Sequence, residues 1–336
     1  MIRFLFFPLA CLFEWATRLR AWGYQVGFLK SIRPKFPTMS IGNIRAGGTG
    51  KTPLLFHTLD WFHEHQLMPG VLSRGYGGDE GRMLEERSPL TLLEEDSDRV
   101  RGLQRLLEKG KPEVLILDDG FQHLRIQRDL DIVLLDATRP FGACFPTGVF
   151  RESARALRRA DLVVVSRAEM VGQEDLNSIW NKVSEVRGNL PLLPRVEGGV
   201  QISKVTNLSY NEELPLEKLD GRSVLLACGI GNPFSFQALC EAHGVQVEAT
   251  SFLRDHSEWP EKAIREFSNY PCVLVTEKDA VKLRGRVPDH VFEVRVEWAF
   301  FRGKSDWVEV LENFVLSARA AKIEPLWQAH LEGSFS

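Results

Sequence analysis

Short apolar runs, separated by amphipathic segments, give the first two thirds of the chain a regular pattern. Their residues are consecutive β-branched or leucine side chains rather than alternating ones, which is typical of strands buried on both faces of a sheet. The runs cover residues 38–41, 69–73, 114–117, 132–135 and 162–166. Helical patterns lie between them, the first over residues 53–65. The sequence therefore predicts an α/β fold with a doubly wound, mostly parallel sheet.

A second α/β pattern follows residues 188–194, which glycine and proline interrupt. Its expected strands cover residues 224–228, 244–252, 272–276 and 291–296. Because glycine and proline interrupt helices and strands, this stretch is a plausible junction between domains. We expect three parts: an amino-terminal region over residues 1–36, a core domain over 37–192 and a smaller α/β domain over 193–336.

The amino-terminal segment is basic and amphipathic. Residues 1–36 hold six arginine or lysine side chains and one acidic side chain, Glu14. The apolar run over residues 4–13 is shorter than the roughly 18–20 residues that cross a bilayer as a helix, and no small-residue cleavage site marks a signal peptide. An apolar stripe follows, formed by Leu12, Trp15, Ala16, Leu19 and Trp22. Such a stripe is typical of a helix on an anionic membrane surface, and also of a helix packed on its own domain.

Composition excludes several other classes of protein. The five cysteines are scattered and form no C-x-x-C pair, which argues against a disulfide framework and a zinc site. The formal net charge of −3 gives no electrostatic signature of nucleic-acid binding. Nothing in the sequence indicates an obligate protein partner.

A glycine-rich loop follows the first predicted strand. In phosphate-binding loops, glycines turn backbone amides inward, a lysine reaches the terminal phosphates and the next hydroxyl holds magnesium. Lys51 and Thr52 fit these last two roles, although Arg45 replaces the glycine that the strict pattern has at its start. The strand before and the helix after supply the structural context that the motif requires. The expected nucleotide-binding residues are Arg45, Ala46, Gly47, Gly48, Thr49, Gly50, Lys51 and Thr52.

Two acidic residues, Asp118 and Asp119, follow the apolar run over residues 114–117. A phosphate-binding loop needs a carboxylate at the end of a neighbouring strand to orient magnesium. Gln122 and His123 come shortly after, so an amide and an imidazole are expected beside the phosphates.

In sequence order, several motifs of the chain together resemble the tetraacyldisaccharide 4′-kinase family, and the resemblance covers nearly the whole chain. They occupy residues 41–43, 47–53, 73–77, 118–123, 128–136, 151–152, 228–233, 255–256 and 276–283. The resemblance implies an ATP-dependent transferase of lipid A biosynthesis, which phosphorylates the 4′-hydroxyl of tetraacyldisaccharide 1-phosphate to give lipid IVA. It also implies Mg²⁺, a P-loop core domain and a peripheral or monotopic place on the cytoplasmic face of the bacterial inner membrane.

The family's motifs also suggest site residues. In the family, the aspartate of a Gly-Asp-Glu motif serves as the base and pairs with a histidine of the second domain, which corresponds to Asp79 and His256. Relatives have a longer insert before this motif, so Asp98 is the alternative base. Lys51 would bind the β- and γ-phosphates. The implied magnesium ligands are Thr52, Asp118, Asp119 and Glu152. The implied acceptor and phosphate contacts are Ser73, Arg74, Glu80, Gln122, His123 and Arg151.

One rival function shares most of these features. A membrane-associated P-loop ATPase switch would also have the loop, the strand-end aspartates and the basic helix, but it would hydrolyse ATP without a lipid acceptor. The guanine-specificity motif of GTPases places one residue between its lysine and aspartate. Lys278 and Asp279 are adjacent, so their register does not fit that motif.

Overall fold

One continuous sheet runs through two lobes of the computed structural model, which describes residues 7–75, 78–219 and 221–316. Residues 4–6 of the amino-terminal run and residues 317–336 of the expected second domain lie outside the described residues. The helices are α2 (Phe7–Gln25), α3 (Lys51–Glu64), α4 (Asp79–Arg87), α5 (Arg99–Lys109), α6 (Gln173–Arg187), α7 (Pro233–Ala242), α8 (Glu261–Glu266) and α9 (Glu277–Leu283), with 3-10 turns at η1 (Ala154–Arg159), η2 (Ala168–Met170), η3 (Leu216–Lys218) and η4 (Phe267–Asn269).

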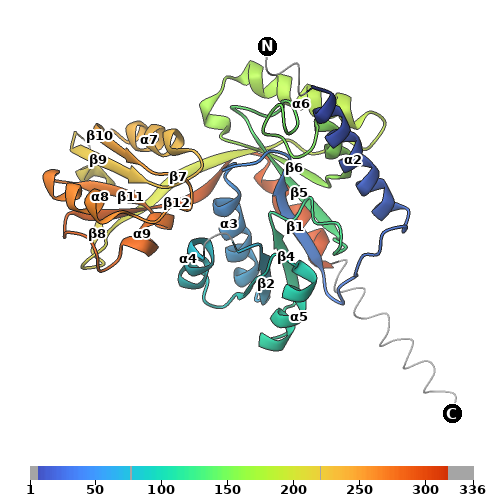
Figure 1. Ribbon diagram of the computed structural model, residues 1–336, viewed down its shortest axis with the longest axis horizontal. Helices are drawn as coiled ribbons and strands as arrows, with labels where there is room; N and C mark the ends of the chain where they lie inside the picture. Colours follow the sequence, from blue (N-terminus) through green and yellow to red (C-terminus); the bar gives the residue numbers. More distant parts are fainter. Residues whose placement is uncertain (1–6, 76–77, 220, 317–336) are drawn as a thin grey trace.

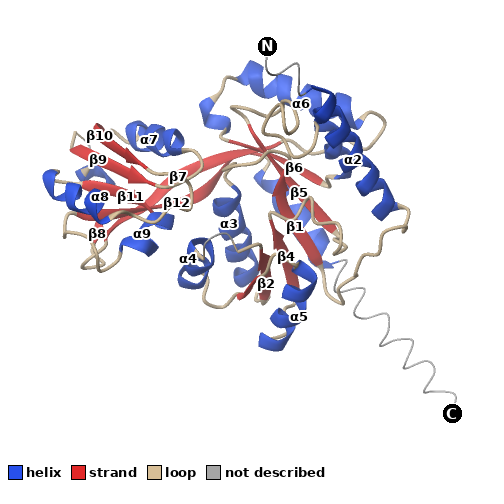
Figure 2. Ribbon diagram, viewed as in Figure 1, coloured by secondary structure: helices blue, strands red, loops and turns tan. Residues whose placement is uncertain are grey.

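Within the described residues, the sheet has twelve strands in the order β10-β9-β11-β12-β7-β6-β5-β1-β4-β2-β3, with β8 paired to β7. The strands are β1 (Thr38–Asn43), β2 (Pro69–Ser73), β3 (Leu92–Glu95), β4 (Val114–Asp118), β5 (Leu130–Asp136), β6 (Leu162–Ser166), β7 (Val196–Asn207), β8 (Glu213–Leu214), β9 (Ser223–Cys228), β10 (Gln246–Phe252), β11 (Val273–Thr276) and β12 (Val291–Arg302). Only the β12–β7 and β7–β8 pairs are antiparallel among these strands (Figure 2). The predicted α/β fold with a mostly parallel sheet is confirmed.

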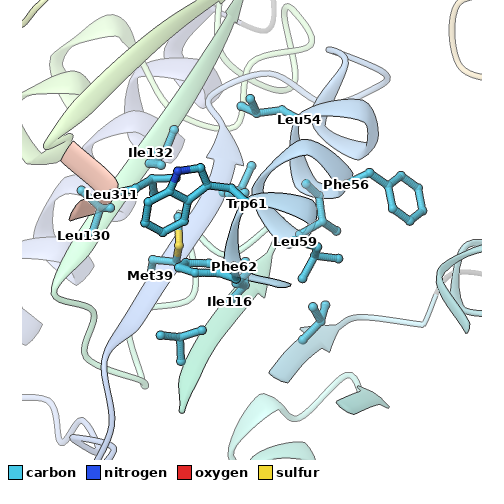
Figure 3. Packing of buried hydrophobic residues seen from close by; sticks show 14 of the residues in the cluster. Met39, Leu54, Phe56, Leu59, Trp61, Phe62, Ile116, Leu130, Ile132 and Leu311 are labelled. Atoms are coloured by element: carbon cyan, nitrogen blue, oxygen red, sulfur yellow. The ribbon is translucent and has the colours of Figure 1, made fainter. Parts of the chain in front are cut away.

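The first lobe covers both faces of its sheet with helices. Successive residues of β4 point to opposite faces: Ile116 packs in the cluster that contains α3, whereas Leu115 packs with Leu106 of α5. Figure 3 shows Trp61 and Phe62 of α3 near Met39 of β1 and Ile132 of β5. Because the strands are buried on both sides, they read as unbroken apolar runs in the sequence.

The second lobe repeats this layered arrangement on a smaller scale. Leu226 of β9 packs with Phe236 and Cys240 of α7, whereas Leu225 packs with Phe267 and other residues near α8 and α9. This sheet is continuous with the first through the antiparallel pair of β7 and β12 (Figure 1). The lobes therefore share long strands as well as a chain connection.

The last described segment returns to the first lobe. After β12, residues 304–316 form a helix whose Trp307, Leu311 and Phe314 pack in the core cluster of β1, β4 and α3. Trp298 of β12 joins the same cluster. The expected boundary at residue 192 falls between α6 and β7, and the chain crosses back over that boundary through β12.

Helix α2 packs on the first lobe with the face opposite its apolar stripe. Ala10 is buried, and the Phe13 ring contacts the Phe145 ring at a centroid distance of 5.8 Å. The stripe points outward, with 60% of Trp15 and 56% of Trp22 exposed. No helix among the described residues is long and apolar enough to cross a bilayer.

Candidate active site

A cavity of about 430 Å³ lies where the two lobes face each other, at the carboxyl ends of the parallel strands. The first lobe contributes the glycine-rich loop before α3, the end of β4 and the start of α4. The second lobe contributes the loops after β9 and β10 and the start of α9. Open α/β sheets bind ligands at this edge, where loops from several strands meet.

The glycine-rich loop has the backbone that phosphate binding requires. Gly47 and Gly50 take positive φ angles of 104° and 84°, a conformation that favours glycine. Helix α3 begins at Lys51, and its first turn carries no acidic side chain. Its amino-terminal amides and partial positive charge are therefore available to an anion.

Arg45 stands where the strict motif has a glycine, and its partner explains the substitution. Its guanidinium lies 2.9 Å from an oxygen of Asp136, which is 1% exposed at the end of β5. Arg167 binds the same carboxylate and also donates a hydrogen bond of 2.9 Å to the carbonyl of Gly48. Asp136 thus fixes the base of the loop through two arginines. Arg45 and Ala46 do not line the cavity, whereas the other expected loop residues do.

The lysine of the loop faces the end of β4. Its Nζ lies 3.4 Å from Asp119 Oδ1, and Arg151 lies 2.6 Å from Asp119 Oδ2. Burial opposes ionisation, but the charges of Lys51 and Arg151 outweigh it and hold the pKa of Asp119 below its usual value. For neighbouring Asp118, burial and the charges of Glu80 and Asp119 raise the pKa to about 7. The two adjacent acids therefore differ in protonation near neutral pH.

These residues fit a magnesium ion bound together with phosphates. Thr52, Asp118 and Asp119 all line the cavity, and Asp119 Oδ1 is buried with Lys51 Nζ 3.4 Å away. Hard oxygen ligands of this kind suit Mg²⁺, which keeps waters and phosphate oxygens in its shell rather than an all-protein cage. The described part of the chain contains no cluster of three or more acidic, histidine or cysteine ligands that could hold a metal.

Asp79 and His256 come together from opposite lobes. Asp79, the first residue of α4, is 2% exposed, and its Oδ1 lies 3.1 Å from His256 Nδ1. Lys282 of α9 lies 3.0 Å from the other oxygen, Oδ2. Burial alone raises the pKa of Asp79, but Lys282, Lys278 and His256 lower it below the ordinary value. His256 lines the cavity and Asp79 lies behind it.

The alternative base lies elsewhere. Asp98 caps the amino terminus of α5 by accepting a hydrogen bond from Val100 N, and it pairs with Arg125 at 3.1 Å. Neither Asp98 nor Asp79 lines the cavity, but Asp79 contacts His256, which does. This contact favours Asp79 over Asp98 as the candidate base.

The other expected contacts divide into two groups. Ser73, Arg74, Glu80 and Arg151 line the cavity, whereas Gln122, His123 and Glu152 do not.

The residues of the second group lie outside the cavity lining and contact one another or neighbouring residues. Glu152 is 7% exposed and pairs with Arg159 at 2.9 Å, and Gln122 donates to Glu152 at 3.0 Å and to the carbonyl of Asn43 at 2.9 Å. Burial and neighbouring arginines lower the pKa of His123 to about 4, so its imidazole is neutral at physiological pH.

Sequence reasoning missed most of the second lobe's contribution to the cavity. Gly231, in the loop after β9, approaches the glycine-rich loop so closely that a Cβ there would lie 3.0 Å from Gly48 N. Asp255 and Lys278 also line the cavity. All three lie in motifs that resemble the family, at residues 228–233, 255–256 and 276–283. Of the residues in these motifs, only His256 was expected in the site.

The cavity has both polar and apolar lining. Besides the phosphate-binding loop and the acids, it is lined by Ile230, Phe236, Leu239, Val200 and Trp298. Sites with a few convergent polar groups and apolar walls are typical of small-molecule binding. This one can hold a phosphorylated ligand together with an apolar or aromatic moiety.

Comparison with known proteins identifies the relatives of this chain. The model of the family described as tetraacyldisaccharide-1-P 4′-kinase matches residues 2–80 and 77–316. The two matches overlap at residues 77–80, beside Asp79, where the resemblance implies a shortened segment. The tetraacyldisaccharide 4′-kinase of Pelobacter propionicus is 34% identical over 312 residues, which cover 84% of this chain and 83% of that protein. The Mannheimia succiniciproducens enzyme of the same name is 30% identical and covers 94% and 95%.

A solved structure is similar over the same length. The crystal structure of LpxK from Aquifex aeolicus in complex with ATP superimposes with a TM-score of 0.74 at 27% identity, and the match covers 95% of this chain and 99% of that one. The likeness therefore includes both lobes and the strands that join them.

Proposed function

The chain belongs to the tetraacyldisaccharide 4′-kinase family and is an ATP-dependent kinase of lipid A biosynthesis, and we propose how its residues divide the reaction. The reaction moves the γ-phosphate of ATP to the 4′-hydroxyl of tetraacyldisaccharide 1-phosphate and yields lipid IVA. One observation carries the proposal: the phosphate-binding loop, the strand-end acids and the Asp79–His256 pair all meet at one cavity.

The first lobe holds and neutralises the phosphates. The glycine-rich loop and the start of α3 bind them through backbone amides, and Lys51 moves from Asp119 to the β- and γ-phosphates. Mg²⁺ would be held by Thr52, Asp118 and Asp119, and when bound it would neutralise charge on the transferring group. Glu152 would contribute indirectly, through its contacts with Gln122 and Arg159.

The second lobe helps to activate the acceptor. The Asp79–His256 pair takes the proton of the sugar hydroxyl as the O–P bond forms, with Asp79 as the base and His256 as its partner. Asp79 is charged because Lys282 and Lys278 lower its pKa. Ser73, Arg74, Glu80 and Arg151 line the remaining space, where the acceptor and the γ-phosphate meet.

The outward stripe of α2 would bring the enzyme to its lipid substrate. Exposed Leu12, Trp15, Leu19 and Trp22 form its apolar face, and Arg18 and Arg20 supply positive charge. Binding at an anionic surface uses these two features together. We propose a peripheral position on the cytoplasmic face of the inner membrane, with no protein partner required.

The decisive experiment supplies both substrates. Purified protein is incubated with γ-labelled ATP, magnesium and detergent-dispersed tetraacyldisaccharide 1-phosphate, and we expect label in the lipid. Inorganic phosphate that accumulates equally with and without the lipid, while the lipid stays unlabelled, would instead favour the ATPase switch.

The role of Asp79 has a matched test. Asp79→Ala removes the carboxylate beside His256 and should lower kcat on the order of 10²–10⁴-fold if this acid is the base. Asp98→Ala removes a helix cap outside the cavity and should change kcat less than about tenfold. The opposite pattern in steady-state kinetics would transfer the role to Asp98.

A further inference from the structure

Five ion pairs among the described residues join helix α4 of the first lobe to helix α9 and the residue after it. They are Asp79–Lys282 at 3.0 Å, Asp79–Lys278 at 3.8 Å, Glu80–Lys278 at 3.1 Å, Arg87–Glu277 at 3.1 Å and Glu86–Arg284 at 2.6 Å. Because α4 begins with Asp79, this ladder holds the proposed base against the second lobe.

Lys278 lies at the centre of the ladder. Its side chain is 12% exposed, and its Nζ lies 2.8 Å from Asp255, 3.1 Å from Glu80 and 3.8 Å from Asp79. The same Nζ is 3.2 Å from His256 Nε2. Burial opposes its charge, but Glu80, Asp255 and Asp79 outweigh it and raise the pKa of Lys278. The ammonium group is therefore charged whenever the enzyme works.

This contact decides which nitrogen of His256 carries the proton. An ammonium group can only donate hydrogen bonds, so His256 Nε2 must accept from Lys278. The proton of the neutral ring is then on Nδ1, which faces Asp79 Oδ1 at 3.1 Å. The imidazole consequently donates to Asp79 and presents a lone pair toward the cavity.

We propose that Lys278 is a positioning residue for phosphoryl transfer, which fixes His256 in the tautomer that pairs with Asp79 and ties the pair to α4. The inference rests on the proposed role of that pair. Lys278 acts through His256 and does not itself touch the reacting atoms. Glu80 and Asp255 hold its ammonium group beside the imidazole.

The charge on Lys278 also affects the pH range of the reaction. The charged groups that face Asp79 are Lys278 and Lys282 from α9, His256 from the loop after β10, Glu80 from α4 and Glu95 from β3. Removing the positive charge of Lys278 raises the pKa of Asp79 and so favours its protonated form. Since the base must be deprotonated to act, the variant should need a higher pH for activity.

The first test is the pH profile of Lys278→Met, with Lys278→Gln where the methionine variant does not fold. We expect the acidic limb of kcat/KM to move up by roughly one pH unit, because the Lys278 charge lies 3.8 Å from Asp79 and no longer favours its ionised form. Lys278→Arg retains the charge and should keep the wild-type limb. Lys262→Met, an exposed lysine in α8 of the same lobe, is the control and should match the wild type.

The second test reads the tautomer without any turnover. Nitrogen spectra of histidine-labelled, nucleotide-free protein should show His256 protonated at Nδ1, and Lys278→Met or Lys278→Gln should lose that preference. His256→Asn identifies the signal.

An unchanged tautomer together with an unchanged acidic limb would overturn the inference. The inference would also be overturned if the Lys278 variant bound ATP tenfold more weakly but kept the acidic limb of the wild type, because Lys278 would then be a phosphate ligand. Absence of lipid phosphorylation by the wild-type protein would reject the proposed function instead, and the spectra would still report the tautomer.

Discussion

The carboxylate of Asp136 stabilises the first lobe although Asp136 does not line the cavity. It lies at the end of β5, 1% exposed, and accepts from Arg45 and Arg167 and from both the backbone and the hydroxyl of Thr138. Arg167 in turn binds the carbonyl of Gly48. Replacing Asp136 by alanine therefore leaves two guanidinium groups without their shared anion, directly beneath the phosphate-binding loop.

The magnitude follows from burial. The Arg45 and Arg167 side chains are 20% and 11% exposed, so water replaces the lost carboxylate only in part. Removing one partner of a buried ion pair costs about 3–5 kcal/mol, whereas folded domains have about 5–15 kcal/mol of total stability. Asp136→Ala should thus lose roughly a fifth or more of the unfolding free energy. Asp136→Asn keeps the acceptor oxygen and should lose less.

Urea unfolding and ATP titration measure the two consequences. We expect a lower unfolding midpoint and weaker ATP binding for Asp136→Ala, because the Gly48 carbonyl loses its fixed donor. Glu185→Ala breaks an exposed ion pair with Lys182 and should change the unfolding free energy by less than about 1 kcal/mol. If Asp136→Ala were as stable as this control, the argument from buried charge would be refuted.

Three further outcomes are expected. The folded pKa of Asp118, about 7, lies above its ordinary value of 3.8, so its ionisation destabilises the nucleotide-free protein as pH rises from about 4 to 7. Asp118→Asn should therefore raise the unfolding free energy at pH 8 by roughly 1–3 kcal/mol and weaken MgATP binding. A variant that is no more stable than the wild type would contradict this argument. Replacing Trp15 and Trp22 together by serine should lower flotation with anionic liposomes about a hundredfold, whereas equal flotation would reject anchoring by α2. Gly231→Val should raise the KM for ATP roughly tenfold, because its Cβ would lie 3.0 Å from Gly48 N, and an unchanged KM would show that the loops separate freely.

The sequence predicted the elements that are determined by residues close together in the chain. The strand over residues 69–73 and the strand over residues 162–166 are confirmed with their predicted bounds, because consecutive apolar residues are the direct consequence of burial on both faces. The glycine-rich loop and the acids after β4 were also readable, since each motif needs only a strand end and the residues beyond it.

Three strands escaped prediction for physical reasons. Strand β8 has only two residues, too few for a pattern. In β7, Gly198 and Gly199 interrupt the apolar pattern, and several exposed residues follow. In β3, two acids occupy half of a short edge strand, so it lacks a continuous apolar run. The length of β12 was underestimated because its second half, beyond residue 296, leaves one lobe for the other and has no uniform pattern.

The partners of charged side chains were beyond the reach of a single sequence. Arg45 looked like a departure from the phosphate-loop motif, and only its pairing with Asp136, 91 residues later, shows why an arginine is tolerated there. The resemblance implied that Glu152 is a metal ligand, but it could not show that Glu152 pairs with Arg159. Charged side chains are long and flexible, so their positions along the chain do not determine which opposite charge they meet.

The short segment before Asp79 makes contacts with the second lobe important for the site. Only Arg74, Gly75 and residues 76–78 separate the end of β2 from α4, so the first lobe offers little chain to orient the helix that carries the proposed base. The ion pairs to α9 also hold that helix, and each joins residues about 190 or more positions apart. The contact between the lobes thus includes the proposed base, the Lys278–His256 contact and Gly231 against the phosphate loop. If these contacts form together, variants in α9 should affect proton transfer even where they leave the phosphate loop unchanged.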